Sequence, residues 1–362
     1  MRIGIDVESG ERPFQVLVKG ALKAIKFFSN ISLYIIGNID SIKKKFPSIN
    51  KVPSIYLINA KEVISMEEKP VTALKKKKFS TVSIGIDMLK KGDIDVFFSA
   101  GNTGATIASS ILSLGMIEGV KRPAMATFFP RIGGGETLIL DIGANPDASE
   151  IDLYNNAILG KGYYNLIWNK KDPSVGLLNM GVELGKGTLS INKAYKSMEN
   201  IPGFIGNVEG YNVFNGTVDV VVCNGFTGNT ILKIAEATRK YFIYLLKKSL
   251  SNDLKISKFK KFILYFFNLS KNYLQRKKLI TSMLLPKYYG AVPLLGIKGL
   301  VMIGHGSCTS EELFNAIELI NKLYSLNYLN MITDYTKKML KKYWQIFIDK
   351  LCYLSIFISR GI

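Results

Sequence analysis

The sequence predicts an α/β/α protein in which a doubly wound, mostly parallel sheet lies between layers of helices. Strand-like apolar runs alternate with helical patterns, and glycine-rich or polar loops follow the strands. One unit, a strand that passes through a glycine turn into a helix, occurs twice, at Asp95–Ile107 and Asp219–Lys233. With 362 residues, 48% of them hydrophobic, the chain can bury a large core in one α/β domain or two intertwined ones.

The amino-terminal elements are expected to form a βαβ unit. Arg2–Val7 has the apolar character of a strand, Pro13 opens a helix that runs through Ile25, and Ile31–Gly37 is the next strand. Later helices are expected on both sides of the first glycine turn, at Ser80–Lys91 and Ile107–Leu114, and near the end of the chain, at Glu311–Leu326. Later strands are expected at Thr137–Ile142, Val175–Leu178, Asp219–Cys223 and Val301–Ser307, the last of these ranges including its end loop.

The two glycine turns are the strongest functional signal, because they align without a gap and share their glycines and threonines. A helix that starts directly after such a turn leaves backbone N–H groups unpaired at the positive end of its dipole, which favours an anion. The shared positions are Gly101, Thr103 and Gly104 in the first copy and Gly225, Thr227 and Gly228 in the second. For one copy alone, the glycines could serve only the turn. The matched pair favours a ligand held where both turns converge at the carboxyl ends of parallel strands.

The net charge of +20 would suit nucleic acid, a membrane or an acidic partner. Only seven of the 48 basic residues are arginine, the residue best suited to reading phosphates and bases, so we expect no nucleic-acid partner. The runs Lys43–Lys45 and Lys75–Lys78 are interpreted as solvated helix faces.

Three cysteines and one histidine argue against a disulfide framework and a zinc site, and we expect neither a metal nor a cofactor. Acidic residues interrupt the amino terminus, so it does not resemble a signal peptide, and no uncharged apolar run reaches the ~18 residues of a membrane span. The prediction is an intracellular protein, soluble or peripherally membrane-associated.

Residues 254–287 form a basic amphipathic segment with nine Lys or Arg and no acid. Its apolar side chains recur at spacings of three and four, as on one face of a helix: Phe259, Phe262, Phe266, Leu269 and Tyr273. This face could bind a membrane surface, or it could pack on the protein's own core or on a second subunit. A second basic, aromatic segment forms a C-terminal extension over residues 331–362.

Several loops together resemble the PlsX-type phosphate acyltransferases over about residues 1–325. The matching segments are Ser99–Ala105, Leu140–Asn145, Gly176–Asn179 with Lys186 and Gly187, Gly206–Gly210, Asp219–Lys233, Pro293–Gly296 and His305–Ser307. The resemblance implies a phosphotransacetylase/isocitrate dehydrogenase-like fold in a domain over residues 1–330, and a homodimer. It also implies formation of acyl phosphate from acyl-[acyl carrier protein] and inorganic phosphate, for phosphatidic acid and phospholipid synthesis. The expected partners are the acidic acyl carrier protein, a membrane surface and a membrane glycerol-3-phosphate acyltransferase, with the enzyme cytoplasmic and peripherally bound.

On this hypothesis, phosphate is the nucleophile, and the protein holds it and stabilises the oxyanion of the intermediate. Phosphate would bind the backbone amides of both glycine turns, with Lys186 or Lys233 balancing its charge. Asn102 and Asn229 are the candidate donors to the thioester oxygen, and His305 is the candidate acid for the leaving thiol. Lys233 could equally be a solvated helix lysine, and His305 could be structural.

The chain departs from the usual family pattern at a few positions. Glu8–Glu11 stands where Met-Gly-Gly-Asp is usual, Phe79–Thr81 where Asp-Ser-Ser is usual, Asn224 where Asp is usual, and Ala291 where a second Gly is usual. These departures leave open a non-catalytic, membrane-associated binding protein on the same fold. A dehydrogenase is weakly supported, because no Gly-x-Gly-x-x-Gly follows the first strand.

Overall fold

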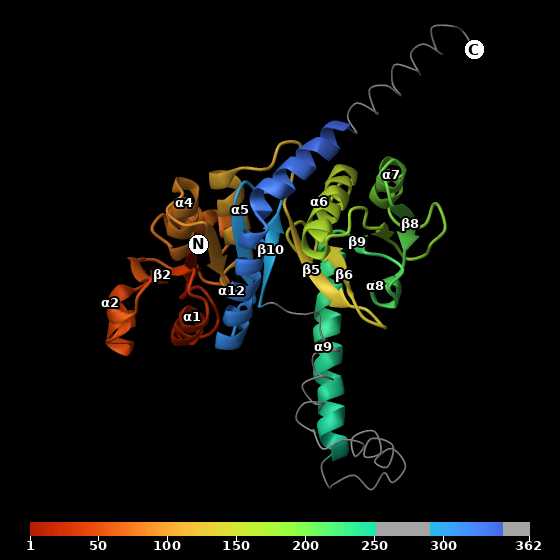
Figure 1. Ribbon diagram of the computed structural model, residues 1–362. Coiled ribbons are helices and arrows are strands. Elements are labelled where there is room, and N and C mark those ends of the chain that lie inside the picture. The colour runs from red at the N-terminus through yellow and green to blue at the C-terminus, as the bar shows by residue number, and fades with distance from the viewer. Residues whose placement is uncertain (251–289, 343–362) are drawn as a thin grey trace, which may run out of the picture.

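The computed structural model describes residues 1–250 and 290–342, which form one sheet with helices on both sides (Figure 1). The sheet has 11 strands in the order β3-β2-β1-β4-β11-β10-β5-β6-β9-β7-β8. Most neighbouring strands are parallel, as the sequence predicts.

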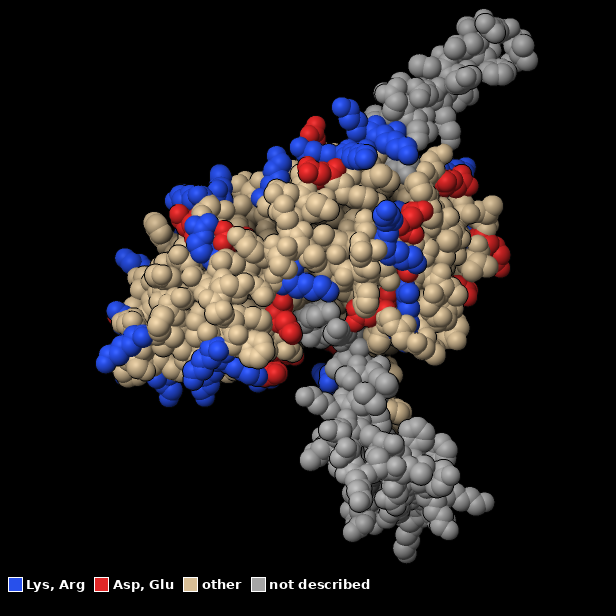
Figure 2. All heavy atoms as spheres, viewed as in Figure 1, with Lys and Arg blue, Asp and Glu red and all other residues tan. Residues whose placement is uncertain are grey.

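The amino-terminal half of the sheet is parallel throughout, and its helices alternate with its strands. Its strands are β1 (Arg2–Asp6), β2 (Ser32–Gly37), β3 (Ile55–Asn59) and β4 (Val96–Ser99). Its helices are α1 (Gln15–Phe27), α2 (Ile39–Lys45), the 3-10 turn η1 (Ile49–Lys51), α3 (Pro70–Lys76), α4 (Thr81–Lys91) and α5 (Thr103–Leu114). Figure 2 shows basic side chains at the lower left, over α1 and α2, where Lys43–Lys45 are exposed as expected for a solvated face.

The second half is also parallel within itself. Its strands are β6 (Glu136–Leu140), β7 (Val175–Leu178), β8 (Phe204–Val208) and β9 (Val220–Val222), and its helices are α6 (Glu150–Trp168), α7 (Leu189–Met198) and α8 (Asn212–Asn215). Valine and leucine side chains of β6, β7 and β9 are fully buried, as in strands covered on both faces.

Antiparallel pairing joins the two halves at the centre. The central strands are β5 (Ala124–Pro130), β10 (Ala291–Leu295) and β11 (Leu300–Gly304). The pairs β11/β10, β10/β5 and β5/β6 are antiparallel, so the second half runs in the opposite direction to the first. The two glycine turns, after β4 and after β9, therefore do not lie at one common edge of parallel strands. Four strands separate β4 from β9, so convergence of the turns needs another element.

The second glycine turn leads into α9 (Gly225–Leu250), a long helix that projects from the body of the molecule (Figure 1). The last full helix, α12 (Ser310–Ser325), packs against α1, and residues 328–342 continue as a further helix. Of the helices in the described part of the chain, none combines the length and hydropathy required to cross a bilayer.

The amphipathic segment 254–287 and its apolar face, Phe259, Phe262, Phe266, Leu269 and Tyr273, lie outside the described residues, as do residues 343–362 of the C-terminal extension.

Candidate active site

The second glycine turn is held tightly against the loop that follows β6. Asn224 caps α9, since its Oδ1 accepts the N–H of Thr227 at 2.8 Å. A Cβ at Gly225 would lie 2.8 Å from the carbonyl oxygen of Asn145, and one at Gly228 would lie 1.9 Å from the carbonyl oxygen of Asp141. Both glycines are therefore required for the close approach of two backbones, in addition to any ligand that they bind. The Asn224 amide fills the capping role that an aspartate would fill at this position.

Asp141 organises the loop after β6. Its carboxylate is fully buried and accepts the backbone N–H groups of Met125, Gly143 and Ala144 on Oδ1 and of Asn145 on Oδ2. Burial raises the pKa of Asp141, while these four donors act in the opposite direction by stabilising the charged form. The outcome is a fixed loop against which the start of α9 packs.

Asn229 lies one turn into α9 and is exposed, next to the Asp141 loop. A Cβ at Gly143 would lie 3.7 Å from the Cβ of Asn229, so the side chain sits directly over the Gly143 backbone. Among the described residues it makes no hydrogen bond, which leaves its amide able to bind a ligand. Thr227 is half-buried and lies at the same end of the helix.

The first glycine turn has a different arrangement. Asn102 caps α5 through its Oδ1, which accepts the N–H of Ala105 at 3.0 Å. Its Nδ2 donates to the carbonyl oxygens of Ser65 and Glu68 at 2.9 and 3.0 Å, and the side chain is buried. The Asn102 side chain therefore holds the loop before α3 in place, and its amide does not point into solvent. In the described part of the chain, the backbone N–H groups of Thr103 and Gly104 have no partner at this helix start.

The repeat is therefore similar in sequence but not equivalent in structure. The cap residue of α5 is Asn102, whereas the cap of α9 is Asn224, which aligns with Ala100, so α9 starts two residues earlier in the repeat. Gly101 packs against Ser9 in the loop after β1, and its N–H donates to Ser99 Oγ at 3.1 Å. In each copy, the glycines allow close packing of the turn against a neighbouring loop. The backbone N–H groups left without a partner in the described structure differ between the two copies.

A buried aspartate also organises the loop after β1. Asp6 accepts the Ser99 hydroxyl at 2.8 Å and the N–H groups of Glu8 and Ser9, and burial raises its pKa. Asp6 and Asp141 thus have the same role at the ends of two strands, one in each half. The sequence interpretation gave neither residue this role, although a lone acid that ends an apolar strand before a glycine-rich loop is a usable signal.

His305, after β11, contacts α9. Its Nε2 lies 3.3 Å from Lys233 Nζ, and its Nδ1 lies 2.8 Å from Ser307 Oγ. The Lys233 ammonium can only donate and needs Nε2 as an acceptor, while the Ser307 backbone N–H donates to Nδ1 at 3.2 Å, so no single tautomer of the neutral imidazole satisfies both contacts. Lys233 also lies 3.3 Å from Glu236 and is exposed. Ser307, not singled out individually from the sequence, orients the imidazole.

The contact between Lys233 and His305 joins the two halves. Lys233 is two turns along α9 from Gly225, about 12 Å at the helical rise, so the helix spans from the Asp141 loop to the end of β11. The loop after β1 lies against the same region, since Glu11 N–H donates to the Gly306 carbonyl and Arg12 Nε to the Ser307 carbonyl.

Lys186 belongs to the loop after β7, which is exposed. The backbone of this loop is held by Asn179, whose Nδ2 donates to the Lys186 carbonyl at 2.9 Å. Since β7 pairs with β9 in parallel, the Lys186 loop lies along the edge at which α9 begins. No contact joins the Lys186 side chain to the other candidate residues in the described structure.

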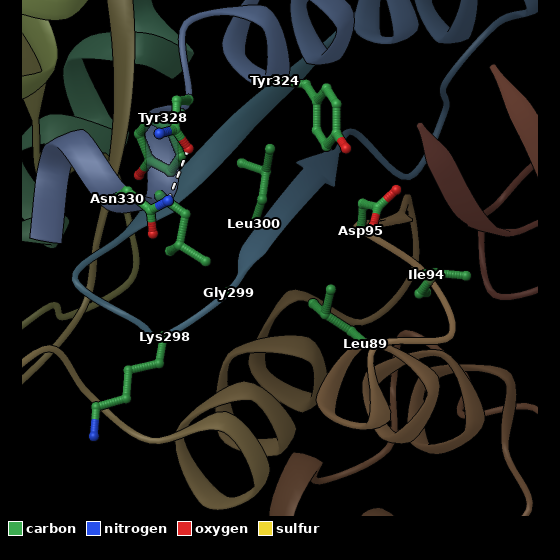
Figure 3. Close-up of a pocket in the computed structure, with 11 residues that line it drawn as sticks. Leu89, Ile94, Asp95, Lys298, Gly299, Leu300, Tyr324, Tyr328 and Asn330 are labelled. Carbon is green, nitrogen blue, oxygen red and sulfur yellow. Dashed lines mark hydrogen bonds between the residues drawn. The ribbon is translucent and has the colours of Figure 1, made fainter. Parts of the chain in front are cut away.

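A pocket of about 480 Å³ lies away from these residues, at the edge where β4 and β11 begin (Figure 3). Its lining includes Leu89, Asp95, Leu300, Tyr324 and Tyr328, none of which was singled out as a site residue from the sequence. Asp95 is already engaged there by Arg2, whose Nη2 lies 2.7 Å from Oδ1. None of the candidate site residues lines this pocket.

Comparisons with known proteins agree with this fold. A family model described as "Fatty acid synthesis protein" matches residues 1–331. A phosphate acyltransferase from Thermoanaerobacterium thermosaccharolyticum is 38% identical over 333 residues, covering 92% of this chain and 96% of the relative. One from Dictyoglomus turgidum is 39% identical over 344 residues, covering 92% of this chain and 99% of the relative.

Solved structures resemble this chain at low sequence identity and support the fold alone. A phosphotransacetylase from Streptococcus pyogenes has a TM-score of 0.56 at 15% identity, covering 94% of both chains. A branched-chain phosphotransacylase from Enterococcus faecalis has a TM-score of 0.53 at 11% identity, covering 89% of this chain and 98% of that one. The predicted phosphotransacetylase-like class and the resemblance to the phosphate acyltransferases are both confirmed, and the chain belongs to the fatty acid synthesis protein family.

Proposed function

We propose that the protein is a phosphate acyltransferase that transfers an acyl group from acyl carrier protein to inorganic phosphate. A phosphate oxygen attacks the thioester carbonyl carbon, the carbonyl oxygen becomes an oxyanion, and the C–S bond breaks to release acyl phosphate and the carrier thiol. The main support for this proposal is that α9 begins beside the Asp141 loop and contacts His305 through Lys233. Thr227 and Asn229 lie on the helix between these two points. The family and its phosphate acyltransferase relatives support the reaction class.

The proposed roles follow from what each group can donate. Phosphate binds the free amides of Thr103 and Gly104 at the start of α5, with Lys233 supplying positive charge. Asn229 donates its amide to the oxyanion, where such a donor lowers the barrier most. His305 takes up the proton of the attacking hydrogen phosphate and passes it to the leaving thiolate. Asn102 acts indirectly, by fixing the turn in which the amides lie.

The proposal is tested by measuring acyl phosphate from acyl-[acyl carrier protein] and phosphate with wild type and Asn229→Ala. Loss of one oxyanion donor lowers kcat by ~10²–10³. The matched control is Asn330→Ala, because Asn330 is an exposed helical asparagine in the pocket at the opposite edge of β4 and β11. An Asn229→Ala enzyme within about threefold of wild type would remove this residue from the transition state.

The wider setting of the reaction is part of the same proposal. The enzyme is cytoplasmic and homodimeric, binds a membrane surface through segment 254–287, and delivers acyl phosphate to a membrane glycerol-3-phosphate acyltransferase for phosphatidic acid synthesis. The support is chemical: a long-chain acyl phosphate is poorly soluble, and the segment combines basic residues with a stripe of aromatic residues. Co-sedimentation with anionic vesicles tests it, with Phe262→Asp/Phe266→Asp expected to bind more weakly while keeping turnover of soluble substrate.

A further inference from the structure

The surface beside the first glycine turn is basic and partly apolar. It consists of α3 and its flanking residues, with six exposed side chains: Lys69, Val71, Lys75, Lys76, Lys78 and Phe79. Val71, on α3, is 52% exposed, and Phe79, in the turn after α3, is 66% exposed, so both apolar side chains are available to a partner. We refer to these six side chains as the α3 surface.

The α3 surface carries uncompensated positive charge. In the described structure, none of its four lysines forms an ion pair, whereas Lys77, the C-cap of α3, is paired with Glu68 at 2.6 Å. The acids nearby are largely engaged: Glu68 holds Lys77, and Glu62 accepts the N–H of Phe79 at 2.9 Å. Glu67 is the exposed exception. The lysines therefore remain able to meet an acidic partner.

Direct contacts tie the α3 surface to the candidate site. Asn102, which caps α5, donates to the carbonyl oxygens of Ser65 and Glu68 in the loop before α3. A Cβ at Gly104 would lie 2.6 Å from Pro70 Cγ, so the first turn of α3 rests on the first turn of α5. A small apolar cluster that includes Ile64, Ala73 and Ala105 fixes the inner side of α3. A macromolecule bound to the outer side of α3 would lie immediately beside the amides that we assign to phosphate.

We infer that the α3 surface is the docking site of the acyl carrier protein. This inference rests on the proposed function, which requires an acidic protein to present a thioester at the site. Exposed lysines that lie close in sequence to exposed apolar side chains match an acidic partner that also has apolar surface. The charges would steer the encounter, and the apolar contacts would stabilise the complex. A solvated helix face, the interpretation of Lys75–Lys78 from the sequence, accounts for the exposure of these lysines. It does not account for the exposure of Val71, which precedes them in the sequence, or of Phe79, which follows them.

The test is the charge reversal Lys75→Glu/Lys76→Glu, with Lys90→Glu/Lys91→Glu as the matched control. Both pairs are the basic residues in the last turn of a helix, so both variants change the net charge by the same amount. The control variant also breaks the ion pair of Lys91 with Asp87 at 2.6 Å, so its folding is checked by its urea denaturation midpoint. The control pair ends α4, which leads into the start of β4, at the opposite end of that strand from the first glycine turn. The Kd for fluorescently labelled holo-acyl carrier protein is measured by anisotropy at low and moderate salt.

We expect the α3 variant to weaken carrier binding about tenfold at low salt and to lose most of its salt dependence, while the control stays within about twofold of wild type. Phe79→Ser, which keeps the charge, should weaken binding without flattening the salt dependence. Equal affinities for the α3 variant and the control, or equal losses in both, would overturn the assignment. Because binding is measured without phosphate or turnover, an inactive wild type that binds the carrier through α3 would contradict the proposed reaction and not the docking site.

Discussion

Replacing Asp219 with asparagine should destabilise the protein without disabling its site. Asp219 immediately precedes β9, and its carboxylate accepts Arg131 Nη2 at 3.0 Å, Lys170 Nζ at 2.6 Å and both the N–H and the hydroxyl of Ser174 at 2.7 and 3.0 Å. The side chain is only 4% exposed. Its repeat counterpart, Asp95, binds Arg2 before β4, so both aspartates anchor the amino-terminal ends of their strands.

The size of the effect follows from the pKa of Asp219, which these donors lower from 3.8 to about 2 against the opposing effect of burial. A lowering of this size corresponds to about 2 kcal/mol of stability at neutral pH. Because Lys170 is exposed, solvent screens its ion pair with Asp219, which makes the loss of stability smaller. Arg131 is mostly buried and would lose its carboxylate partner, which raises the loss toward about 4 kcal/mol. A lowered acid pKa stabilises the fold above the unfolded value of 3.8, and this stabilisation is lost as the pH falls toward about 2.

The assay is urea denaturation of wild type and Asp219→Asn at pH 7, 5 and 3, with kcat measured at pH 7. The variant should be less stable by about 2–4 kcal/mol at pH 7, with a difference that narrows below pH 5. Its kcat should stay near that of wild type, because Asp219 lies at the end of β9 opposite the helix start. An unchanged denaturation midpoint at pH 7, or a difference that does not narrow on acidification, would refute the reasoning.

Three further substitutions test other features. Cys223→Ser should retain most activity, because burial raises the pKa of the Cys223 thiol far above its usual value; labelled acyl-enzyme formed without phosphate would contradict this. Gly228→Ala should lower activity at least tenfold in steady-state assays, since its Cβ would lie 1.9 Å from the Asp141 carbonyl oxygen and displace the start of α9. Lys161→Met should lower the free energy of unfolding by about 2–4 kcal/mol in urea titrations, because the buried ammonium binds Asp172 and the carbonyls of Pro173 and Pro202; an unchanged midpoint would contradict it.

The sequence predicted most strands and helices within a few residues, because apolar runs bounded by glycine turns give clear boundaries. Val175–Leu178 is reproduced residue for residue, and the predicted helix Ser80–Lys91 differs only in that Ser80 is its cap. Strand direction was not predictable in the same way. β5 and β10 are apolar runs like their neighbours, and nothing in their composition reveals that they pair antiparallel.

The individual roles of site residues were harder to predict than the site's loops. Asn102 is an oxyanion-donor candidate by residue type, yet an asparagine before Thr-Gly-Ala is equally a helix cap, and the structure places it as one. The contact between Lys233 and His305 depends on the path of α9 between two oppositely directed half-sheets. Residues 72 apart in sequence give no local signal of such a contact.

The position of β10 and β11 also has a consequence for how the chain is assembled during synthesis. These strands come after α9 in the chain but lie between β4 and β5 in the sheet. While the ribosome makes the first 250 residues, β4 and β5 each have one edge without a neighbour, and the two half-sheets have no backbone pairing between them. Such open edges are where nascent chains associate wrongly. Residues 291–304 close both edges at once, so the region between the halves takes its final form only when nearly the whole chain has emerged.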